Sequence, residues 1–339
     1  MTGLLASEQP LAAAYDLGLM DLDGVMYEGE RSIVNAATGA AQARELGLQL
    51  MFVTNNSSRP APDVARHLTE LGIPATPEEV YSSAMAAVEL ALQRHGEGAK
   101  VLLIGGAGLE DAVAASSLVR VDSAEDAPVA VIQGLRKDIG WADLSEASFA
   151  IGRGADHIAT NLDSTLPVER GLAIGNGSLV AAVVHATGVS PVSAGKPEAL
   201  IYRLAAERVQ GERPLAVGDR LNTDIRGSNA SGIPSLHVLT GVSSAREVIM
   251  AVPEERPSYL GIDLTDLSLP HPPVTRDGEW VTCRSARVRI ADDAAHLARD
   301  GGTFQLTEPA TITLDEYRAL AAAAWAEPGI EVPEVVVER

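Results

Sequence analysis

Asp21 and Asp23 are two carboxylates that stand at the end of a short apolar run, Leu17-Gly18-Leu19-Met20. The run is typical of a buried strand, and in an open parallel sheet ligands bind at the carboxyl ends of the strands. Gly24 allows the chain to turn at this point, so both acids can be aimed at one reacting atom. One carboxylate could then attack phosphorus while the other handles the proton of the leaving group. Taken alone, residues 21–25 are equally well explained as an acidic turn after a strand.

Three further polar clusters stand next to apolar or helical stretches in the same way. One offers a hydroxyl and side-chain amides, one a lysine, and one two more acids. Together with the first pair, they can hold a phosphate dianion and a divalent cation side by side. The clusters are Thr54-Asn55-Asn56-Ser57-Ser58-Arg59 after residues 50–53, Ser193-Ala194-Gly195-Lys196-Pro197 before a helical stretch at 198–207, and Gly218-Asp219-Arg220-Leu221-Asn222-Thr223-Asp224-Ile225 after residues 214–217.

The acids of this set suit a magnesium ion. Mg²⁺ prefers hard oxygen ligands and usually keeps several waters, so one or two carboxylates together with a substrate phosphate suffice. Asp21 and Asp219 are the natural side-chain ligands, and the backbone carbonyl of Asp23 could be a third. Asp224 could orient a metal-bound water, or it could support the metal indirectly by contacting the direct ligands. We therefore predict a metal site that involves these four aspartates.

The remaining polar residues suit the phosphate group. A phosphate monoester resists attack by an anion until its own charge is neutralised. Thr54 can hydrogen-bond the phosphoryl oxygens, helped by the N–H groups of the neighbouring Asn55 and Asn56. Lys196 supplies a compact positive charge for the phosphate and for the nucleophile. These four residues form the predicted phosphate-binding set.

In their order and spacing, the four motifs resemble those of the haloacid dehalogenase-like phosphatase superfamily. The resemblance covers residues 15–263. The residues of the motifs are similar to those of one branch of that superfamily. This branch contains para-nitrophenyl phosphatases, phosphoglycolate and glycerol-3-phosphate phosphatases, pyridoxal phosphatases and nucleotidases. The implied fold is α/β, with a doubly wound, Rossmann-like parallel sheet as the catalytic core.

The resemblance also implies a two-step mechanism. Asp21 is the implied nucleophile, which displaces the alcohol and forms an aspartyl-phosphate. Asp23 is the implied general acid and base, which protonates the departing oxygen and then deprotonates the attacking water. The other implied roles are phosphate binding for Thr54, charge stabilisation for Lys196, and magnesium binding for the acidic motif of Asp219 and Asp224.

About 140 residues separate Thr54 from Lys196, far more than a doubly wound sheet needs. They alternate between strand-like and helix-like stretches, which indicates an α/β module with a core of its own. The resemblance implies a cap domain inserted after the second motif. We place the cap at residues 83–191, between core segments 1–82 and 192–268. The stretches are residues 100–105, 108–116, 128–132, 142–153, 157–160 and 177–187.

Asn161 and Asp163 follow one of these strand-like stretches, in a loop that matches an asparagine, aspartate and proline loop of the family. The resemblance implies that both lie near the leaving group of the substrate or between cap and core. The alternative is a structural role, because asparagine and aspartate cap turns well.

Residues 269–339 form a further segment. Leu269-Pro270-His271-Pro272-Pro273 is predicted to be a linker, because its prolines prevent a helix and disfavour the interior of a strand. Residues 279–284 and 286–290 have strand character, and a capping box at Thr313-Leu314-Asp315-Glu316 begins a helix that runs to 326. We predict a small α+β extension with an accessory or dimerisation role. A similar extension occurs in some actinobacterial-type glycerol-3-phosphate phosphatases.

The amino-acid composition limits the classes of function that the chain can have. The formal net charge of −20 over 339 residues argues against general binding to nucleic acid or to anionic membranes. The single cysteine, Cys283, excludes an internal disulfide and agrees with a reducing cytoplasm. The first ten residues do not resemble a secretory signal, and no apolar run approaches the length of a membrane span. We expect a cytoplasmic protein with no nucleic-acid or membrane partner.

The predicted function is a magnesium-dependent phosphatase, a phosphoric monoester hydrolase acting on a small phosphorylated metabolite. Glycerol 3-phosphate is the first candidate because of the extension, ahead of phosphoglycolate, pyridoxal phosphate and nucleoside monophosphates. A phospho-receiver signalling module uses similar residues but lacks a large insertion between threonine and lysine. A non-catalytic phospho-ligand-binding or regulatory protein is the third hypothesis. By resemblance, a homodimer is expected.

Overall fold

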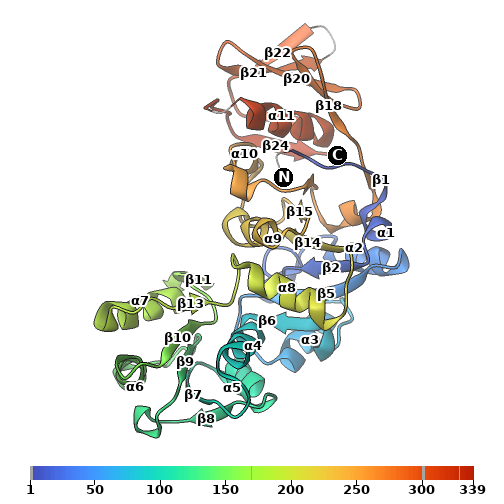
Figure 1. Ribbon diagram of the computed structural model, residues 1–339. Helices are drawn as coiled ribbons and strands as arrows, with labels where there is room; N and C mark the ends of the chain where they lie inside the picture. Colours follow the sequence, from blue (N-terminus) through green and yellow to red (C-terminus); the bar gives the residue numbers. More distant parts are fainter. Residues whose placement is uncertain (1–2, 169, 300–301, 328) are drawn as a thin grey trace. The chain divides into compact units, whose positions relative to one another are not determined.

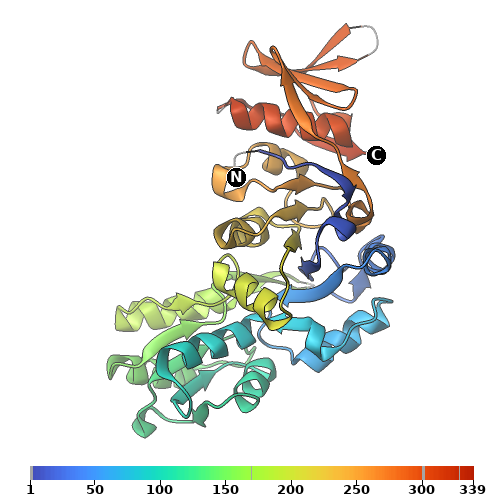
Figure 2. The same cartoon turned by 45° about the vertical axis from the view of Figure 1, so that its right-hand side comes forward.

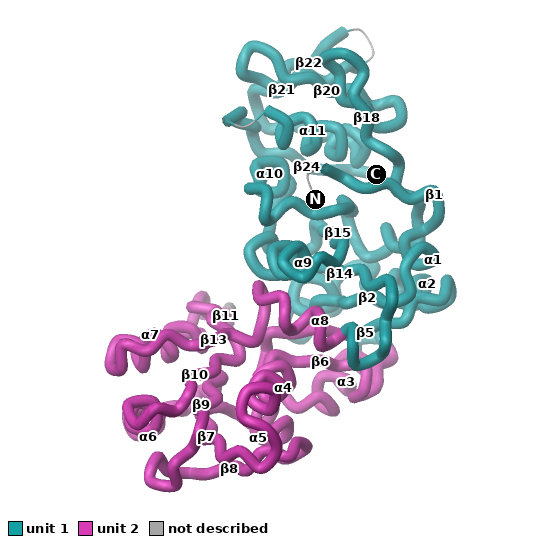
Figure 3. Tube along the Cα trace, viewed as in Figure 1, with its two compact units in different colours: residues 1–51, 71–73, 206–339 teal, residues 52–70, 74–205 magenta. Residues whose placement is uncertain are grey.

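The computed structural model describes residues 3–168, 170–299, 302–327 and 329–339. The chain forms two compact units (Figure 3), one with residues 1–51, 71–73 and 206–339 and the other with residues 52–70 and 74–205. Each unit is described by itself. The boundaries of the three domains proposed from the sequence differ from this division and stay a prediction.

A six-stranded sheet contains the strands that precede the predicted catalytic motifs, in the order β16-β15-β14-β2-β5-β6. β14 pairs in parallel with β2 on one side and with β15 on the other. All four residues of β2 are buried, as expected of a parallel strand covered on both faces. The strands are β2 (Leu17–Met20), β5 (Gln49–Thr54), β6 (Val80–Ser82), β14 (Pro214–Gly218), β15 (Ser235–His237) and β16 (Tyr259–Leu260).

The helices around these strands are short and rich in small residues. In the first unit, α10 begins with a capping box in which Ser244 and Glu247 bind each other's backbone N–H groups. The helices outside the predicted cap and extension are α1 (Leu11–Ala14), α2 (Ala36–Glu45), α3 (Ala61–Glu70), α8 (Ala199–Arg208), α9 (Arg226–Ser231) and α10 (Ala245–Ile249).

The second unit contains a five-stranded parallel sheet in the order β13-β10-β9-β7-β8. In Figures 1 and 2, α4 and α5 lie on one side of this sheet and α6 and α7 on the other. The helix α4 is capped by the preceding Ser82, whose hydroxyl accepts a hydrogen bond from the Met85 N–H at 3.4 Å, and it ends before Gly96. These elements confirm the α/β module predicted for this stretch.

The bounds of the elements in this module are close to the predicted ones. An antiparallel hairpin, β11 with β12, precedes its last helix. The elements are α4 (Ser83–His95), β7 (Lys100–Ile104), α5 (Ala107–Ala114), β8 (Val119–Val121), β9 (Ala130–Gln133), α6 (Trp141–Gly152), β10 (Asp156–Ala159), β11 (Thr165–Val168), β12 (Gly171–Ile174), α7 (Asn176–Thr187) and β13 (Val192–Ser193).

The C-terminal segment is an antiparallel sheet packed on one long helix, α11 (Leu314–Ala326). The predicted capping box at Thr313 and Glu316 begins this helix. Figure 1 shows α11 between the sheet and the elements β24 and α10. The antiparallel strands are β18 (Val274–Asp277), β19 (Trp280–Cys283), β20 (Ala286–Ala291), β21 (Ala294–Arg299) and β22 (Gly302–Leu306), and β23 (Ala310–Thr313) pairs in parallel with β24 (Val335–Glu338).

The predicted linker is more ordered than its prolines suggested. Pro270–His271 forms a two-residue strand, β17, which pairs antiparallel with β1 (Ser7–Pro10). A proline is tolerated at such a position because a two-stranded ribbon needs few backbone N–H donors.

The extension shares a hydrophobic core with the rest of the first unit. Apolar side chains of α11 belong to one buried cluster with Ile225, Val248 and Leu260. Buried polar contacts join the same parts: the Trp325 indole N–H donates to the carbonyl of Val248 at 3.1 Å, and the buried Arg318 donates to the carbonyl of Leu260 at 3.0 Å. The α/β fold class with an inserted α/β cap and a C-terminal α+β extension is therefore confirmed.

Within the described ranges, none of the helices combines the length and apolar character that a membrane crossing needs.

Candidate active site

Two neighbouring strands of the first unit carry Asp21 and Asp219 to the same edge of the sheet. β2 and β14 are parallel, with Met20 opposite Val217. Asp21 follows β2 directly, and its N–H donates to the carbonyl of Val217 at 2.8 Å. Asp219 follows the end of β14 at Gly218. The parallel pairing thus places both acids at carboxyl ends of adjacent strands, where open α/β sheets bind ligands.

Asp224 completes a cluster of three acids. It lies in a short π-helix, Leu221–Ile225, and one of its carboxylate oxygens accepts a hydrogen bond from the Arg220 N–H at 3.1 Å. One carboxylate oxygen from each of Asp21, Asp219 and Asp224 lies within 4.8 Å of the other two. π-Helical turns often occur at functional sites because they redirect a side chain without ending the helix.

Two glycines make room for the carboxylate of Asp219. Gly24 has a φ of +86°, and a Cβ at this position would stand 2.5 Å from Asp219 Oδ2. A Cβ on Gly241 would overlap the same oxygen. The loop after β15 therefore closes tightly around this carboxylate, and any larger residue at either position would displace it.

Backbone groups hold Asp219 in place. The Val242 N–H donates to its Oδ2 at 2.6 Å, and the Ser243 N–H donates to its carbonyl at 3.1 Å. The ring of His237 is also within hydrogen-bond distance of that carbonyl, at 3.0 Å from Nε2. Burial lowers the pKa of His237 to about 4, so at neutral pH the ring is uncharged and Nε2–H donates. An oriented carboxylate is a better metal ligand than a mobile one.

The residues around Asp219 were not identified from the sequence. Gly241 and Val242 lie in a glycine-containing loop that follows a strand, the same local signal that marked the other motifs. A glycine-containing loop after a strand is too common in α/β proteins to identify these residues without the structure.

The three acids fit a hard divalent cation. They offer only oxygen ligands, which Mg²⁺ and Ca²⁺ prefer over nitrogen or sulfur. Asp219 and Asp224 are buried, and burying several carboxylates close together is costly unless a positive charge compensates for them. The carboxylate of Asp23 is outside this cluster of described residues, and the residue is exposed. Its predicted metal contact through the backbone carbonyl and its role as acid and base stay predictions.

In the second unit, Asn55 joins the loop after β5 to Lys196, the predicted phosphate-binding lysine. Its Oδ1 accepts a hydrogen bond from the Lys196 N–H at 2.8 Å, and its Nδ2 donates to the Lys196 carbonyl at 3.1 Å. The Lys196 side chain is buried, with its ammonium 5.8 Å from the centre of the Tyr202 ring. Asn55 therefore binds the backbone that carries the lysine.

Asn161 and Asp163 lie against the same asparagine. The Asn161 side chain donates to the carbonyl of Asn55 at 2.7 Å, and Asp163 Oδ2 accepts from Asn55 Nδ2 at 3.2 Å. Asn161 Oδ1 also accepts from the Asp163 N–H at 3.2 Å, which is the turn-capping contact considered above. The two residues thus cap their own turn and contact the predicted phosphate loop.

Thr54 and Asn56 both organise the loop itself. The Thr54 hydroxyl accepts from the Asn56 N–H at 3.1 Å, and Asn56 Oδ1 accepts from the N–H of Ser58 at 2.9 Å. Thr54 is buried at the end of β5. Their predicted contacts with phosphate stay predictions.

Comparison with known proteins identifies the family. Residues 18–118 match the family model of haloacid dehalogenase-like hydrolases, and residues 193–267 match a second, related hydrolase model. A D-glycerol 3-phosphate phosphatase of Mycobacterium tuberculosis is 48% identical over 257 residues, which are 76% of this chain and 72% of the relative.

The chain belongs to the haloacid dehalogenase-like hydrolases. An acid sugar phosphatase of Staphylococcus saprophyticus is 36% identical over 75% of this chain and 96% of the relative, and a 5′-nucleotidase of Bacillus subtilis is 37% identical over 73% and 95%. The predicted class of enzyme, a phosphoric monoester hydrolase, is confirmed by these phosphatase relatives.

Solved structures of this hydrolase family agree with the fold. A glycerol phosphate phosphatase of Mycobacterium tuberculosis, solved in complex with magnesium, superposes with a TM-score of 0.83 at 39% identity, over 99% of this chain and 96% of that one. A 4-nitrophenylphosphatase of Thermotoga maritima has a TM-score of 0.70 at 30% identity, over 76% of this chain and 98% of that one. About a quarter of this hydrolase therefore has no counterpart in the second structure.

Proposed function

We propose that this hydrolase is a magnesium-dependent phosphatase that uses an aspartyl-phosphate intermediate, with glycerol 3-phosphate as its first candidate substrate. The observation that supports the chemistry is the cluster of Asp21, Asp219 and Asp224 at the ends of two parallel strands. Its oxygen-only ligands and its glycine-lined surroundings suit a small hard cation. The magnesium complex of the related phosphatase from Mycobacterium tuberculosis supports the choice of metal.

Asp21, Asp219 and Asp224 would hold the ion, with the backbone carbonyl of Asp23 as a further ligand. When bound, magnesium would neutralise the charge of the phosphate and so allow an anionic nucleophile to approach it. The contacts of Val242 and Arg220 with the carboxylates of Asp219 and Asp224 would keep these two ligands oriented.

Asp21 attacks the phosphorus, and the ester oxygen leaves as the bond to the Asp21 carboxylate forms. Asp23 donates a proton to the departing oxygen, which gives the free alcohol. Asp23 then takes a proton from the water that attacks the aspartyl-phosphate, so that inorganic phosphate is released and Asp21 is restored. The exposure of Asp23 supports this role, because both the alcohol and the water must reach it.

Thr54 and Lys196 bind the phosphoryl oxygens in this proposal. Asn55, which the sequence grouped with the phosphate ligands, would act as a positioning residue, because both polar groups of its amide are bound to the Lys196 backbone. Asn161 and Asp163 would stabilise Asn55 through their hydrogen bonds with its carbonyl group and its side-chain amide.

The choice of substrate rests on similarity. The relative with 48% identity is a D-glycerol 3-phosphate phosphatase, and the solved glycerol phosphate phosphatase matches nearly the whole chain, including the share that the 4-nitrophenylphosphatase lacks. Phosphoglycolate, pyridoxal phosphate and nucleoside monophosphates are the alternatives to be tested beside it.

The test is phosphate release from a panel of both glycerol phosphates, phosphoglycolate, pyridoxal phosphate, a sugar phosphate and nucleoside monophosphates. Each compound is measured with and without magnesium, on the wild type and on Asp21→Asn. We expect magnesium-dependent release, highest with glycerol 3-phosphate, that is absent in the variant. Preference for another compound would overturn the substrate, whereas release that persists in Asp21→Asn would overturn the mechanism.

We also propose a homodimer, by resemblance to the family. Light scattering of the full chain tests this, since the mass of one chain, 35.4 kDa, would contradict it.

A further inference from the structure

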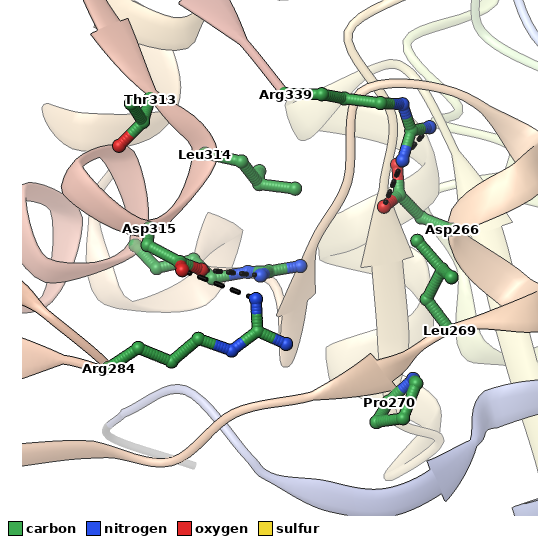
Figure 4. Close-up of a pocket in the computed structure, with 9 residues that line it drawn as sticks. Asp266, Leu269, Pro270, Arg284, Thr313, Leu314, Asp315 and Arg339 are labelled. Carbon is green, nitrogen blue, oxygen red and sulfur yellow. Dashed lines mark hydrogen bonds and ion pairs between the residues drawn. The ribbon is translucent and has the colours of Figure 1, made fainter.

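A pocket lies between the end of the catalytic sheet and the C-terminal extension, within the first unit. Its volume is about 340 Å³, which is in the range of sites for small molecules. Asp266 lines it from the segment after β16, and the remaining lining residues belong to the extension. Figure 4 shows this pocket with the ion pairs around it. The two family models end at residue 118 and at residue 267, so neither reaches the extension.

The charges in the wall of the pocket are unevenly distributed. Arg284 and Arg318 share a single carboxylate, that of Asp315, at one end, whereas Arg339 at the other end faces the carboxylates of Asp263 and Asp266. The end at Asp315 therefore carries one positive charge in excess, in a chain whose formal net charge is −20. This local excess favours an anion beside Asp315.

Two of the arginines are each bound by more than one protein group. Arg339 binds the carboxylate of Asp266 at 3.1 Å and that of Asp263 at 2.9 Å. Arg318 binds Asp315 at 3.1 Å and donates twice to the carbonyl of Leu260. Arg318 thus already balances the charge of Asp315, and Arg339 is shared between two carboxylates.

Arg284 is the surplus cation at the Asp315 end. Among the described residues its guanidinium makes one hydrogen bond, at 3.3 Å, to Asp315, and 57% of its side chain is exposed. A guanidinium has five N–H donors in a planar fork that suits carboxylate, phosphate and sulfonate groups. Most of the donors of Arg284 are therefore available to a ligand.

The backbone of Arg284 is in an unfavourable conformation. Its φ is +50°, in the turn between β19 and β20, where glycine or asparagine is the usual residue. An arginine at such a position costs stability in comparison with glycine. In Figure 4 the side chain extends along the pocket toward Asp315.

The rest of the wall is mostly apolar. Leu269, Pro270 and Leu314 present hydrocarbon to the cavity, and Leu269 is 42% exposed. An inorganic anion would leave this surface unused, whereas an anion with an apolar body would cover it.

We propose that this pocket binds a small molecule with one anionic group, held by Arg284, and an apolar body that packs on Leu269, Pro270 and Leu314. The site is separate from the three-acid cluster and independent of the proposed function. Carboxylate, phosphate and sulfonate share the chemistry that Arg284 recognises.

The probe for this site is anilinonaphthalenesulfonate, whose fluorescence rises in apolar surroundings and whose sulfonate supplies the anion. The full-length wild type, Arg284→Gln and Arg287→Gln are titrated with the dye. Arg287 is an exposed arginine of the same sheet and serves as the matched control. We expect saturable binding to the wild type and to Arg287→Gln, and an affinity about tenfold or more lower in Arg284→Gln, because a charge-assisted hydrogen bond is lost.

Two further arms separate the anionic group from the apolar body. Phenylnaphthylamine, which lacks the sulfonate, should bind the wild type more weakly and should not distinguish it from Arg284→Gln. Leu269→Trp should fill the pocket and abolish dye binding without any change of charge. Equal dye affinity in the wild type and Arg284→Gln, equal affinity for the dye and its neutral analogue, or no saturable binding to the wild type would each overturn the proposal.

Discussion

The side-chain amide of Asn55 binds both polar groups of the Lys196 peptide, accepting from its N–H at 2.8 Å and donating to its carbonyl at 3.1 Å. The two residues are 141 positions apart in the chain. Because the Asn55 amide binds both the N–H and the carbonyl of Lys196, it fixes the direction in which the Lys196 side chain leaves the backbone. Asn55 is therefore suited to position the lysine.

Asn55→Ala should lower kcat by about tenfold or more and lower the free energy of unfolding by about 1–3 kcal/mol, because a partly buried N–H and carbonyl lose their partner. The magnesium concentration for half-maximal activity should stay the same, since the acids proposed to bind the metal belong to the other unit. Steady-state kinetics and denaturant unfolding measure these quantities. Asn229→Ala is the control, because the Asn229 amide also binds backbone carbonyl groups, those of Glu254 and Arg256, but outside the candidate site. An equal loss of kcat there would contradict a specific role for Asn55.

Asp21→Asn should abolish turnover, because an amide oxygen is a poor nucleophile and one carboxylate of the metal cluster is lost. Asp23→Asn should reduce kcat strongly and leave magnesium binding largely intact, because its carboxylate lies outside the three-acid cluster. Calorimetric titration of magnesium into both variants, beside phosphate-release assays, checks the difference. Wild-type rates in Asp21→Asn would remove the nucleophile assignment.

Gly241→Ala should raise the magnesium concentration needed for half-maximal activity by about tenfold or more. The added Cβ overlaps the Asp219 carboxylate, so this ligand has to move away from its position. Gly152→Ala is the matched control, because a Cβ there meets no neighbour within 4 Å. If both variants need the same magnesium concentration as the wild type, the tight packing around Asp219 is not required for metal binding.

The protein should lose stability below about pH 6.5 through His271. Burial, followed by the charge of Arg318, lowers the pKa of this ring from 6.5 to about 4. Because the pKa in the folded state is lower than in the unfolded state, the unfolded chain binds more protons between these values. The contribution of His271 is therefore complete above pH 6.5 and is lost as the pH falls toward 4, by roughly 3 kcal/mol in all.

Thermal and denaturant unfolding between pH 4 and 8 test this expectation. His271→Gln should have a flatter dependence of stability on pH than the wild type, whereas the exposed His185→Gln should follow the wild type. A variant curve parallel to that of the wild type would show that His271 does not titrate in this way.

Most of the elements, and the three acids that the structure brings together, could be read from the sequence alone. Buried parallel strands appear as short apolar runs, so the positions of β2 and β14 were readable, and with them the acids that follow each strand. The helix at 314–326 was predictable because its capping box is local. Such signals depend on neighbours along the chain.

Other features depend on which distant segments pack together, and only the tertiary structure decided them. Asn55 was grouped with the phosphate ligands, yet its amide is bound to a peptide far along the chain. The close packing of Gly241 on the Asp219 carboxylate could not be predicted from the sequence either, and nor could the surplus charge of Arg284 in the pocket of the extension. A side chain's neighbours are set by the packing of the whole fold, whereas residue type and spacing encode only burial, turns and chemical capacity.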